Sequence, residues 1–89
     1  MRTDTFTRCG TAVGEAVEEL NKATAAYPAM RSAHEGFAIL LEEVEELKAH
    51  VWVKQSKRDI AAMRKEAVQV AAMALRFIAD VCNEETGRA

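Results

Sequence analysis

The sequence has little of what turns, sheets and membrane spans require. Its 89 residues include one proline and four glycines, and no run alternates β-branched with polar residues as a half-buried strand would. No uncharged stretch reaches the roughly 20 apolar residues that cross a bilayer. The first residues contain an early acid, Asp4, and lack the apolar segment of a secretion signal. We therefore expect a cytoplasmic protein with no membrane contact.

Cysteines are few, and neither sign of charge dominates. Cys9 and Cys82 fit no C-x-x-C or zinc spacing, so we expect them to be free thiols that are buried or half-buried. Twelve Lys and Arg stand against fourteen Asp and Glu, for a net charge of −2. We do not expect binding to nucleic acid through bulk positive charge.

What the chain does contain is helical periodicity from end to end, which predicts an all-α fold in a single domain, 1–89. Helices are expected at about 11–27, 32–53 and 57–82, followed by a frayed tail over 83–89. The first helix ends before Pro28, because a residue that precedes proline avoids the helical conformation. Its start is open between Asp4 and Thr11, since Gly10 and Gly14 weaken the first turns.

Two helix starts are marked by capping residues. Ser32 and Glu35 have the spacing of a capping box, and Ser56 with Asp59 repeats that spacing. The linkers before these starts are short, so the second and third helices should form an antiparallel hairpin, with the first helix added to it.

Both hairpin helices have a broad apolar face. On the second helix it comprises Phe37, Leu40, Val44, Leu47 and Val51, and on the third Ile60, Met63, Ala67, Val70, Ala71, Ala74, Ile78 and Val81. The arc on the third helix is wider than one neighbouring helix covers. We therefore expect a helical bundle completed by oligomerisation, as a homo-dimer or homo-tetramer.

Acidic residues flank these faces in pairs. Glu43 and Glu46 are three residues apart, as are Glu66 and Gln69, so the members of each pair project side by side. In an antiparallel hairpin the two pairs reach the same level. Three carboxylates that converge there would repel one another without a cation, and oxygen ligands favour Mg²⁺ or Mn²⁺. The alternative is a solvated acidic face, which Glu-rich helices commonly have.

A family resemblance bears on this choice. The segment 27–80 resembles the MazG-like, all-α nucleoside triphosphate pyrophosphohydrolases, whose E-E-x-x-E motif corresponds to residues 42–46 and whose E-x-x-D motif corresponds to residues 66–69. The runs at 32–37 and 69–77 are similar to a small subgroup that is often found in bacteriophages. One position departs from the pattern, because Gln69 stands where the family has aspartate.

The resemblance implies a site and a reaction. Glu43, Glu46, Glu66 and Gln69 would hold Mg²⁺ or Mn²⁺, and Glu42 would complete the catalytic set with the three other glutamates. The reaction would cleave a nucleoside triphosphate into the monophosphate and pyrophosphate.

Other roles are less well defined by the sequence. Lys54, Lys57 and Arg76 are candidates to bind phosphate, and Trp52 or Phe37 could stack on the base. The alternative function is a non-catalytic helical oligomer of the same fold that acts as a nucleotide-binding or regulatory module. The uncharged Gln69 side chain favours that alternative.

Overall fold

The computed structural model describes residues 2–83, and these residues confirm the prediction of an all-α fold. The α-helices are α1 (Arg2–Arg8), α2 (Ala12–Ala26), α3 (Ala33–Val51) and α4 (Ile60–Phe77); a 3₁₀ turn, η1 (Gln55–Lys57), precedes α4, and a π-helical turn, η2 (Ile78–Cys82), follows it. The predicted tail over 83–89 lies outside the described residues except for Asn83. Within 2–83 no helix combines the length and apolar character needed to cross a membrane.

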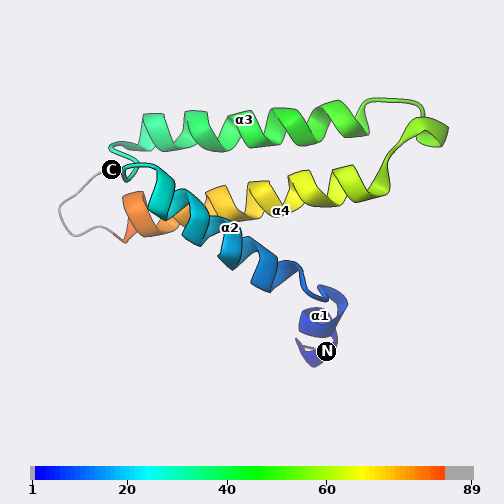
Figure 1. The fold of residues 1–89 in the computed structure, drawn as a ribbon, viewed down its shortest axis with the longest axis horizontal. Coiled ribbons are helices and arrows are strands. Elements are labelled where there is room, and N and C mark those ends of the chain that lie inside the picture. Colours follow the sequence, from blue (N-terminus) through cyan, green and yellow to red (C-terminus); the bar gives the residue numbers. More distant parts are fainter. Residues whose placement is uncertain (1, 84–89) are drawn as a thin grey trace.

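Helices α3 and α4 form an antiparallel hairpin, and α2 lies across α4 (Figure 1). Helix α4 is therefore the central element, since it packs against both α2 and α3. The linker between α2 and α3 returns the chain to one end of the hairpin, and the turn with η1 closes the other end.

The helix starts agree with the capping prediction in part. Ser32 caps α3, with its Oγ accepting a hydrogen bond from the Glu35 amide at 3.1 Å. The Glu35 carboxylate accepts from the Arg31 amide at 2.6 Å, one residue earlier than a capping box requires. Asp59 caps α4 through the Ala62 amide. The prediction of Ser56 as the cap was wrong, because Ser56 lies within the 3₁₀ turn.

The N-terminal region contains a helix that the sequence did not predict. Helix α1 ends at Arg8, and Gly10 follows with a φ of 59°, in the left-handed region that favours glycine after a helix end. The chain then enters α2. Cys9 lies in this break and Cys82 at the end of η2, so both thiols are free and exposed rather than buried as expected.

The buried core is small and lies where α2 crosses α4. It comprises Ala16, Met30, Val68, Ala72, Met73 and Val81, together with Arg76. The predicted apolar face of α4 was partly wrong, because α2 covers Val68 and Ala72, which were not assigned to it. Four residues of the predicted face are exposed instead: Ile60, Ala67, Ala71 and Ile78.

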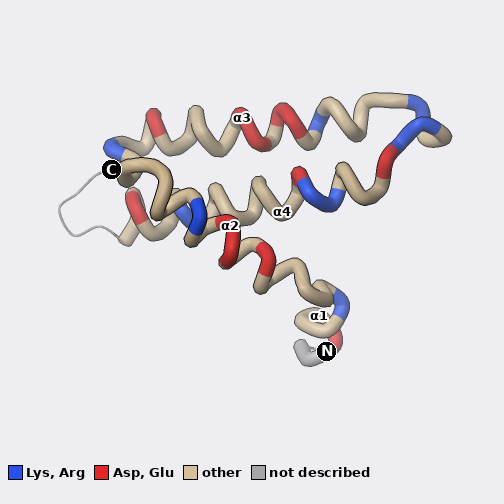
Figure 2. The backbone as a smooth tube through the Cα atoms, in the orientation of Figure 1, with Lys and Arg blue, Asp and Glu red and all other residues tan. Residues whose placement is uncertain are grey.

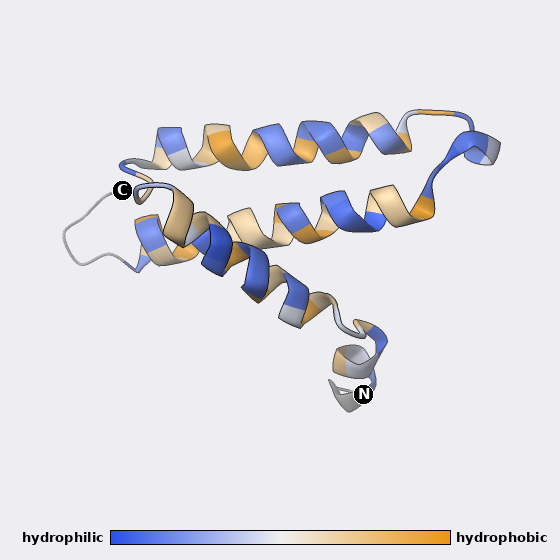
Figure 3. Cartoon of the chain, viewed as in Figure 1, coloured by the Kyte–Doolittle hydropathy of each residue, from blue (hydrophilic) through white to orange (hydrophobic). Residues whose placement is uncertain are grey.

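These exposed residues belong to a larger apolar surface of the hairpin. Helix α3 contributes Phe37, Leu41 and Val44, which are 58%, 40% and 39% exposed, and α4 contributes Ala67, Ala71, Leu75 and Ile78. At 100° per residue, the three α3 residues fall within about 60° of one another and the four α4 residues within about 80°, so each set forms one stripe. Figure 3 shows hydrophobic and hydrophilic segments in alternation along both helices. We call this surface the uncovered face, since no described segment covers it.

Helix α3 packs tightly against Phe77 and Met30 at Gly36, so a larger residue at this position should reduce stability. A Cβ added there would lie 2.7 Å from Phe77 Cδ2 and 3.0 Å from Met30 Sδ, and the Met30 side chain is fully buried. Gly36→Ala should lower the free energy of unfolding by about 1–3 kcal/mol through overpacking.

The matched control is Gly14→Ala in α2, where an added Cβ meets nothing within 4 Å. It should raise stability by up to about 1 kcal/mol, as alanine does at a helix interior. Urea unfolding followed by circular dichroism measures both changes, and equal effects of the two substitutions would contradict the packing described here.

Candidate functional site

Three glutamates converge near the middle of the hairpin formed by α3 and α4. Glu43 and Glu46 on α3 and Glu66 on α4 each place one carboxylate oxygen so that the three atoms lie within 4.8 Å of one another. The i, i+3 spacing aligns the first two, and the antiparallel register places Glu66 opposite them. In Figure 2, acidic positions on α3 and α4 occupy this part of the hairpin. The predicted convergence of these three side chains is confirmed.

The surroundings of Glu43 disfavour its charge. Partial burial raises the pKa of the Glu43 carboxyl, and the carboxylates of Glu46, Glu66 and Glu42 raise it further. Glu66 is half-buried, and its Oε2 lies 3.9 Å from His50 Nε2. A cation placed among the three glutamates would relieve the repulsion.

The oxygen spacing is close to that of a hard-metal site. Oxygens around an octahedral Mg²⁺ stand about 3–4 Å apart, as the ~2.1 Å metal–oxygen distance requires. The separations found here, up to 4.8 Å, need only small side-chain rotations to match. Glu46 is exposed, so it is free to make such a rotation. The three residues could therefore hold Mg²⁺ or Mn²⁺.

Gln69, the fourth predicted ligand, contacts a residue that the sequence did not single out. Its Nε2 donates a hydrogen bond to Glu19 Oε1 on α2 at 2.9 Å. This bond, followed by one from Lys22, lowers the pKa of the Glu19 carboxyl. Only the uncharged amide oxygen of Gln69 remains as a ligand atom. Sequence reasoning missed Glu19 because nothing in the local pattern shows where α2 crosses α4.

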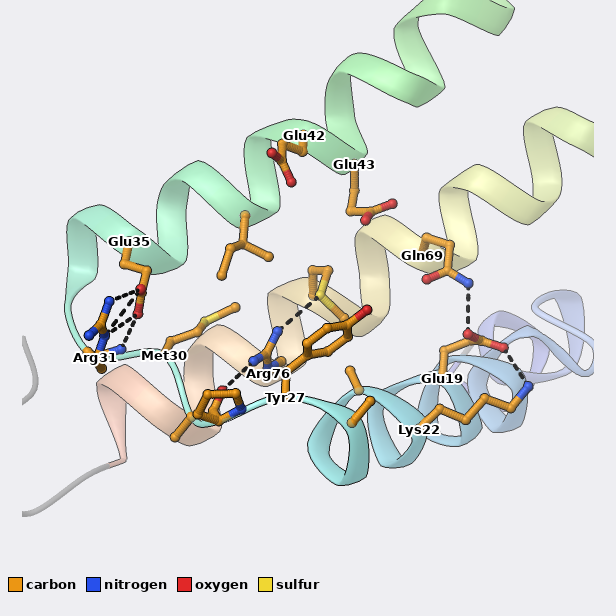
Figure 4. Close-up of a pocket in the computed structure, with 16 residues that line it drawn as sticks. Glu19, Lys22, Tyr27, Met30, Arg31, Glu35, Glu42, Glu43, Gln69 and Arg76 are labelled. Carbon is orange, nitrogen blue, oxygen red and sulfur yellow. Dashed lines mark hydrogen bonds and ion pairs between the residues drawn. The ribbon is translucent and has the colours of Figure 1, made fainter.

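A cleft of about 950 Å³ opens beside the carboxylates, between α2, α3, α4 and the linker of α2 to α3. Glu42, Glu43 and Gln69 line it toward the carboxylate cluster, whereas Tyr27 and Arg76 line another part of it (Figure 4). Two ion pairs also border it, Lys22 with Glu19 and Arg31 with Glu35.

Arg76 fixes the linker that borders this cleft. Its Nη2 donates to the Pro28 carbonyl oxygen at 2.7 Å, and its Nε lies 3.6 Å from Asp80 Oδ2. The same Asp80 oxygen accepts a hydrogen bond from the Met30 amide at 3.0 Å. The Tyr27 ring lies 5.9 Å from the Arg76 guanidinium carbon. Arg76 and Asp80 together therefore hold the linker against α4.

The structure does not bring all the predicted residues to this cleft. Lys54 and Lys57 lie in the turn with η1, at the end of the hairpin away from the cleft (Figure 2). Trp52 and Phe37 are 74% and 58% exposed and do not line it. The aromatic side chain that lines it is Tyr27, which the sequence placed at the end of the first helix and did not single out for the site.

Comparison with known proteins adds no relative: no protein-family model, curated protein or solved structure matches the chain. The resemblance to MazG-like enzymes therefore stays a prediction from the motifs.

The raised pKa of Glu43 predicts a pH-dependent stability effect. An acid whose pKa is higher in the folded than in the unfolded state destabilises the fold once it ionises, and this penalty disappears as the pH falls below both values. Without divalent ions, Glu43→Gln should therefore raise the urea midpoint at pH 7. The gain should stay below about 1 kcal/mol because solvent screens this partly exposed group.

The control for this experiment is Glu45→Gln, an exposed position on α3 outside the cluster. It should leave the urea midpoint nearly unchanged. The difference between the two variants should vanish near pH 3, where Glu43 is protonated in both states. A Glu43→Gln variant that is no more stable than Glu45→Gln at pH 7 would contradict the repulsion inferred here.

Proposed function

We propose that the chain is a metal-dependent pyrophosphohydrolase that cleaves a nucleoside triphosphate into the monophosphate and pyrophosphate. The observation that carries this proposal is the convergence of Glu43, Glu46 and Glu66 beside a cleft large enough for a nucleotide. The motif resemblance over residues 27–80 supports the same reaction. Because the proposed substrate is a nucleoside triphosphate, we place the activity in the cytoplasm.

Each acid would have a distinct task. Glu43, Glu46 and Glu66 would hold Mg²⁺ or Mn²⁺, with the amide oxygen of Gln69 as a weaker neighbouring ligand. The bound ion would neutralise triphosphate charge and lower the pKa of the water that attacks the α-phosphorus. Glu42 lines the cleft next to Glu43, where its carboxylate would orient that water or a metal ligand.

The second candidate is a nucleotide-binding or regulatory module of the same fold without catalysis. The specific observation in its favour is Gln69, which brings no charge and whose amide nitrogen is engaged by Glu19. Loss of one carboxylate weakens the attraction for a divalent cation. The two candidates differ in whether pyrophosphate is released.

Hydrolysis is tested by measuring pyrophosphate release from a panel of ribo- and deoxyribonucleoside triphosphates with Mg²⁺ or Mn²⁺. Glu46→Gln and Glu66→Gln should each lower kcat/KM by at least about 10- to 100-fold, since even outer partners of a metal site have effects of this size. Gln69→Asp should increase the affinity for Mg²⁺ by restoring a charged ligand.

Glu45→Gln is the matched control and should retain wild-type activity, because Glu45 lies outside the cluster on the same helix. Activity that survives both Glu46→Gln and Glu66→Gln unchanged would overturn the enzymatic proposal. Nucleotide binding without pyrophosphate release, in the wild type and in Gln69→Asp, would support the binding module.

We also propose that a second copy of the chain covers the uncovered face. Its larger side chains, Phe37, Leu41, Val44, Leu75 and Ile78, are 39–58% exposed. Large apolar side chains that stay exposed together on one surface are typical of a protein–protein interface. A homo-dimer or a homo-tetramer would then complete the helical bundle.

Phe37→Glu should dissociate this assembly, because it places a charge within the uncovered face. Light scattering coupled to size-exclusion chromatography should give a multiple of 9.8 kDa for the wild type and the monomer mass for the variant. The control is Ala38→Glu, at an exposed neighbour that projects about 100° away around α3. A monomeric wild type would refute the proposed assembly.

A further inference from the structure

One donor group of the Arg76 guanidinium, Nη1, lacks a strong acceptor beside the cleft. The Arg76 side chain is only 6% exposed, and two of its three nitrogens have oxygen partners, Nη2 with Pro28 O and Nε with Asp80. Among the described residues, the Nη1 group meets only the thioether of Met73, at 3.9 Å. Because thioether sulfur is a weak acceptor, a buried donor of this kind is left poorly satisfied.

The position of Arg76 separates it from the carboxylate cluster. It follows Glu66 by ten residues on one nearly continuous helix, which corresponds to about 15 Å along the axis. Arg76 therefore lies toward the linker end of the cleft, whereas Glu43 lines the part nearer the carboxylate cluster. Figure 4 shows the Arg76 guanidinium beside the Tyr27 ring, on the side of the cleft toward the linker. A nucleotide with its phosphates near Glu43 would extend its base toward this pair.

The charge around Arg76 indicates what kind of group it would bind. Asp80 already stands 3.6 Å from the guanidinium and balances its charge. A neutral acceptor therefore satisfies Nη1 without adding a second buried anion. The guanidinium lies over one face of the Tyr27 ring, and Tyr27, which is 64% exposed, offers its edge to a planar heterocycle beside Arg76.

We propose that Arg76 reads the nucleobase, with Nη1 donating to a carbonyl oxygen of a base that packs against the edge of Tyr27, so that oxo-bases are preferred over their amino counterparts. Arginine donates hydrogen bonds to carbonyl and ring-nitrogen acceptors of bases in nucleic-acid recognition. An exocyclic amino group is itself a donor, so it cannot accept a hydrogen bond from Nη1. This inference rests on the nucleotide site proposed above, and it replaces the phosphate-binding role expected for Arg76 from the sequence.

The test uses two matched pairs of nucleoside monophosphates, inosine against adenosine monophosphate and uridine against cytidine monophosphate. The members of each pair differ in one exocyclic group and in the adjacent ring nitrogen, which carries a hydrogen only in the oxo-base. Binding to the full chain is measured by calorimetry without divalent ions, so the result does not depend on hydrolysis. The oxo member of at least one pair should bind about 10- to 100-fold more tightly, the discrimination of one well-placed pairing. Equal binding within both pairs, or no binding of any of the four, would overturn the proposal.

Three variants separate reading of the base from a structural role. Arg76→Lys should lose the preference while circular dichroism shows a retained helical fold. Met73→Gln leaves Arg76 in place and offers Nη1 a competing amide oxygen, so it should also reduce the preference, and it provides the test if Arg76→Lys fails to fold. Tyr27→Ala should weaken both members of a pair to a similar extent. A preference unchanged in Met73→Gln or in folded Arg76→Lys would overturn the assignment.

This design distinguishes failure of the inference from failure of the proposed function. Discrimination between the monophosphates without pyrophosphate release from any triphosphate would retain Arg76 as the base-reading group and refute the hydrolase. Pyrophosphate release together with equal binding within both pairs would retain the hydrolase and refute the role of Arg76.

Discussion

The antiparallel register of α3 against α4 is the constraint on which the rest of this protein depends. It sets the Glu43 and Glu46 pair opposite Glu66, so that the carboxylate oxygens come within 4.8 Å of one another. A shift by one helical turn would move Glu66 about 5 Å along the axis and disperse the cluster. Gly36 contributes to this register because its missing side chain lets the Phe77 ring and Met30 pack directly against α3. Repulsion within the acid cluster opposes the same packing, as the raised pKa of Glu43 indicates. The hairpin therefore holds together three charges that would separate in solution.

A second set of contacts connects the hairpin to the cleft. Arg76 and Asp80, one turn apart on consecutive helical segments, bind the Pro28 carbonyl and the Met30 amide of the linker. This pair satisfies backbone groups that would otherwise lose water as Met30 becomes buried. It also places Tyr27 at the cleft. The same contacts thus support the linker and shape the region assigned to the base. Glu66 and Arg76 both lie on α4, and Glu43 and Glu46 face α4 from α3, so the proposed catalytic and recognition parts share one helix.

The small core and the broad exposed apolar surface have a common origin. Helix α2 packs against α4, where Val68 and Ala72 are buried, and no described helix buries the apolar residues of the uncovered face. Residues such as Phe37 and Leu75 then remain exposed, although their helical spacing is that of core positions. Burial against a second copy would supply the hydrophobic stabilisation that a chain of this length gains only sparingly by itself.

Local sequence determined the helices and the pairing of acids. Periodicity and caps predict α3 to within about two residues and the segment of α4 with η2 to within about three, and the spacing of Glu43, Glu46 and Glu66 specifies their convergence once the hairpin is antiparallel. These features depend on interactions between residues that are near in sequence, so they can be read from the chain. The crossing of α2 over α4 was decided only by tertiary packing. It buries Val68 in place of Ala67, brings Glu19 to Gln69, and makes Tyr27 the aromatic residue of the cleft. No local pattern specifies these contacts, because each joins positions about 50 residues apart or selects one of two apolar sides of the same helix.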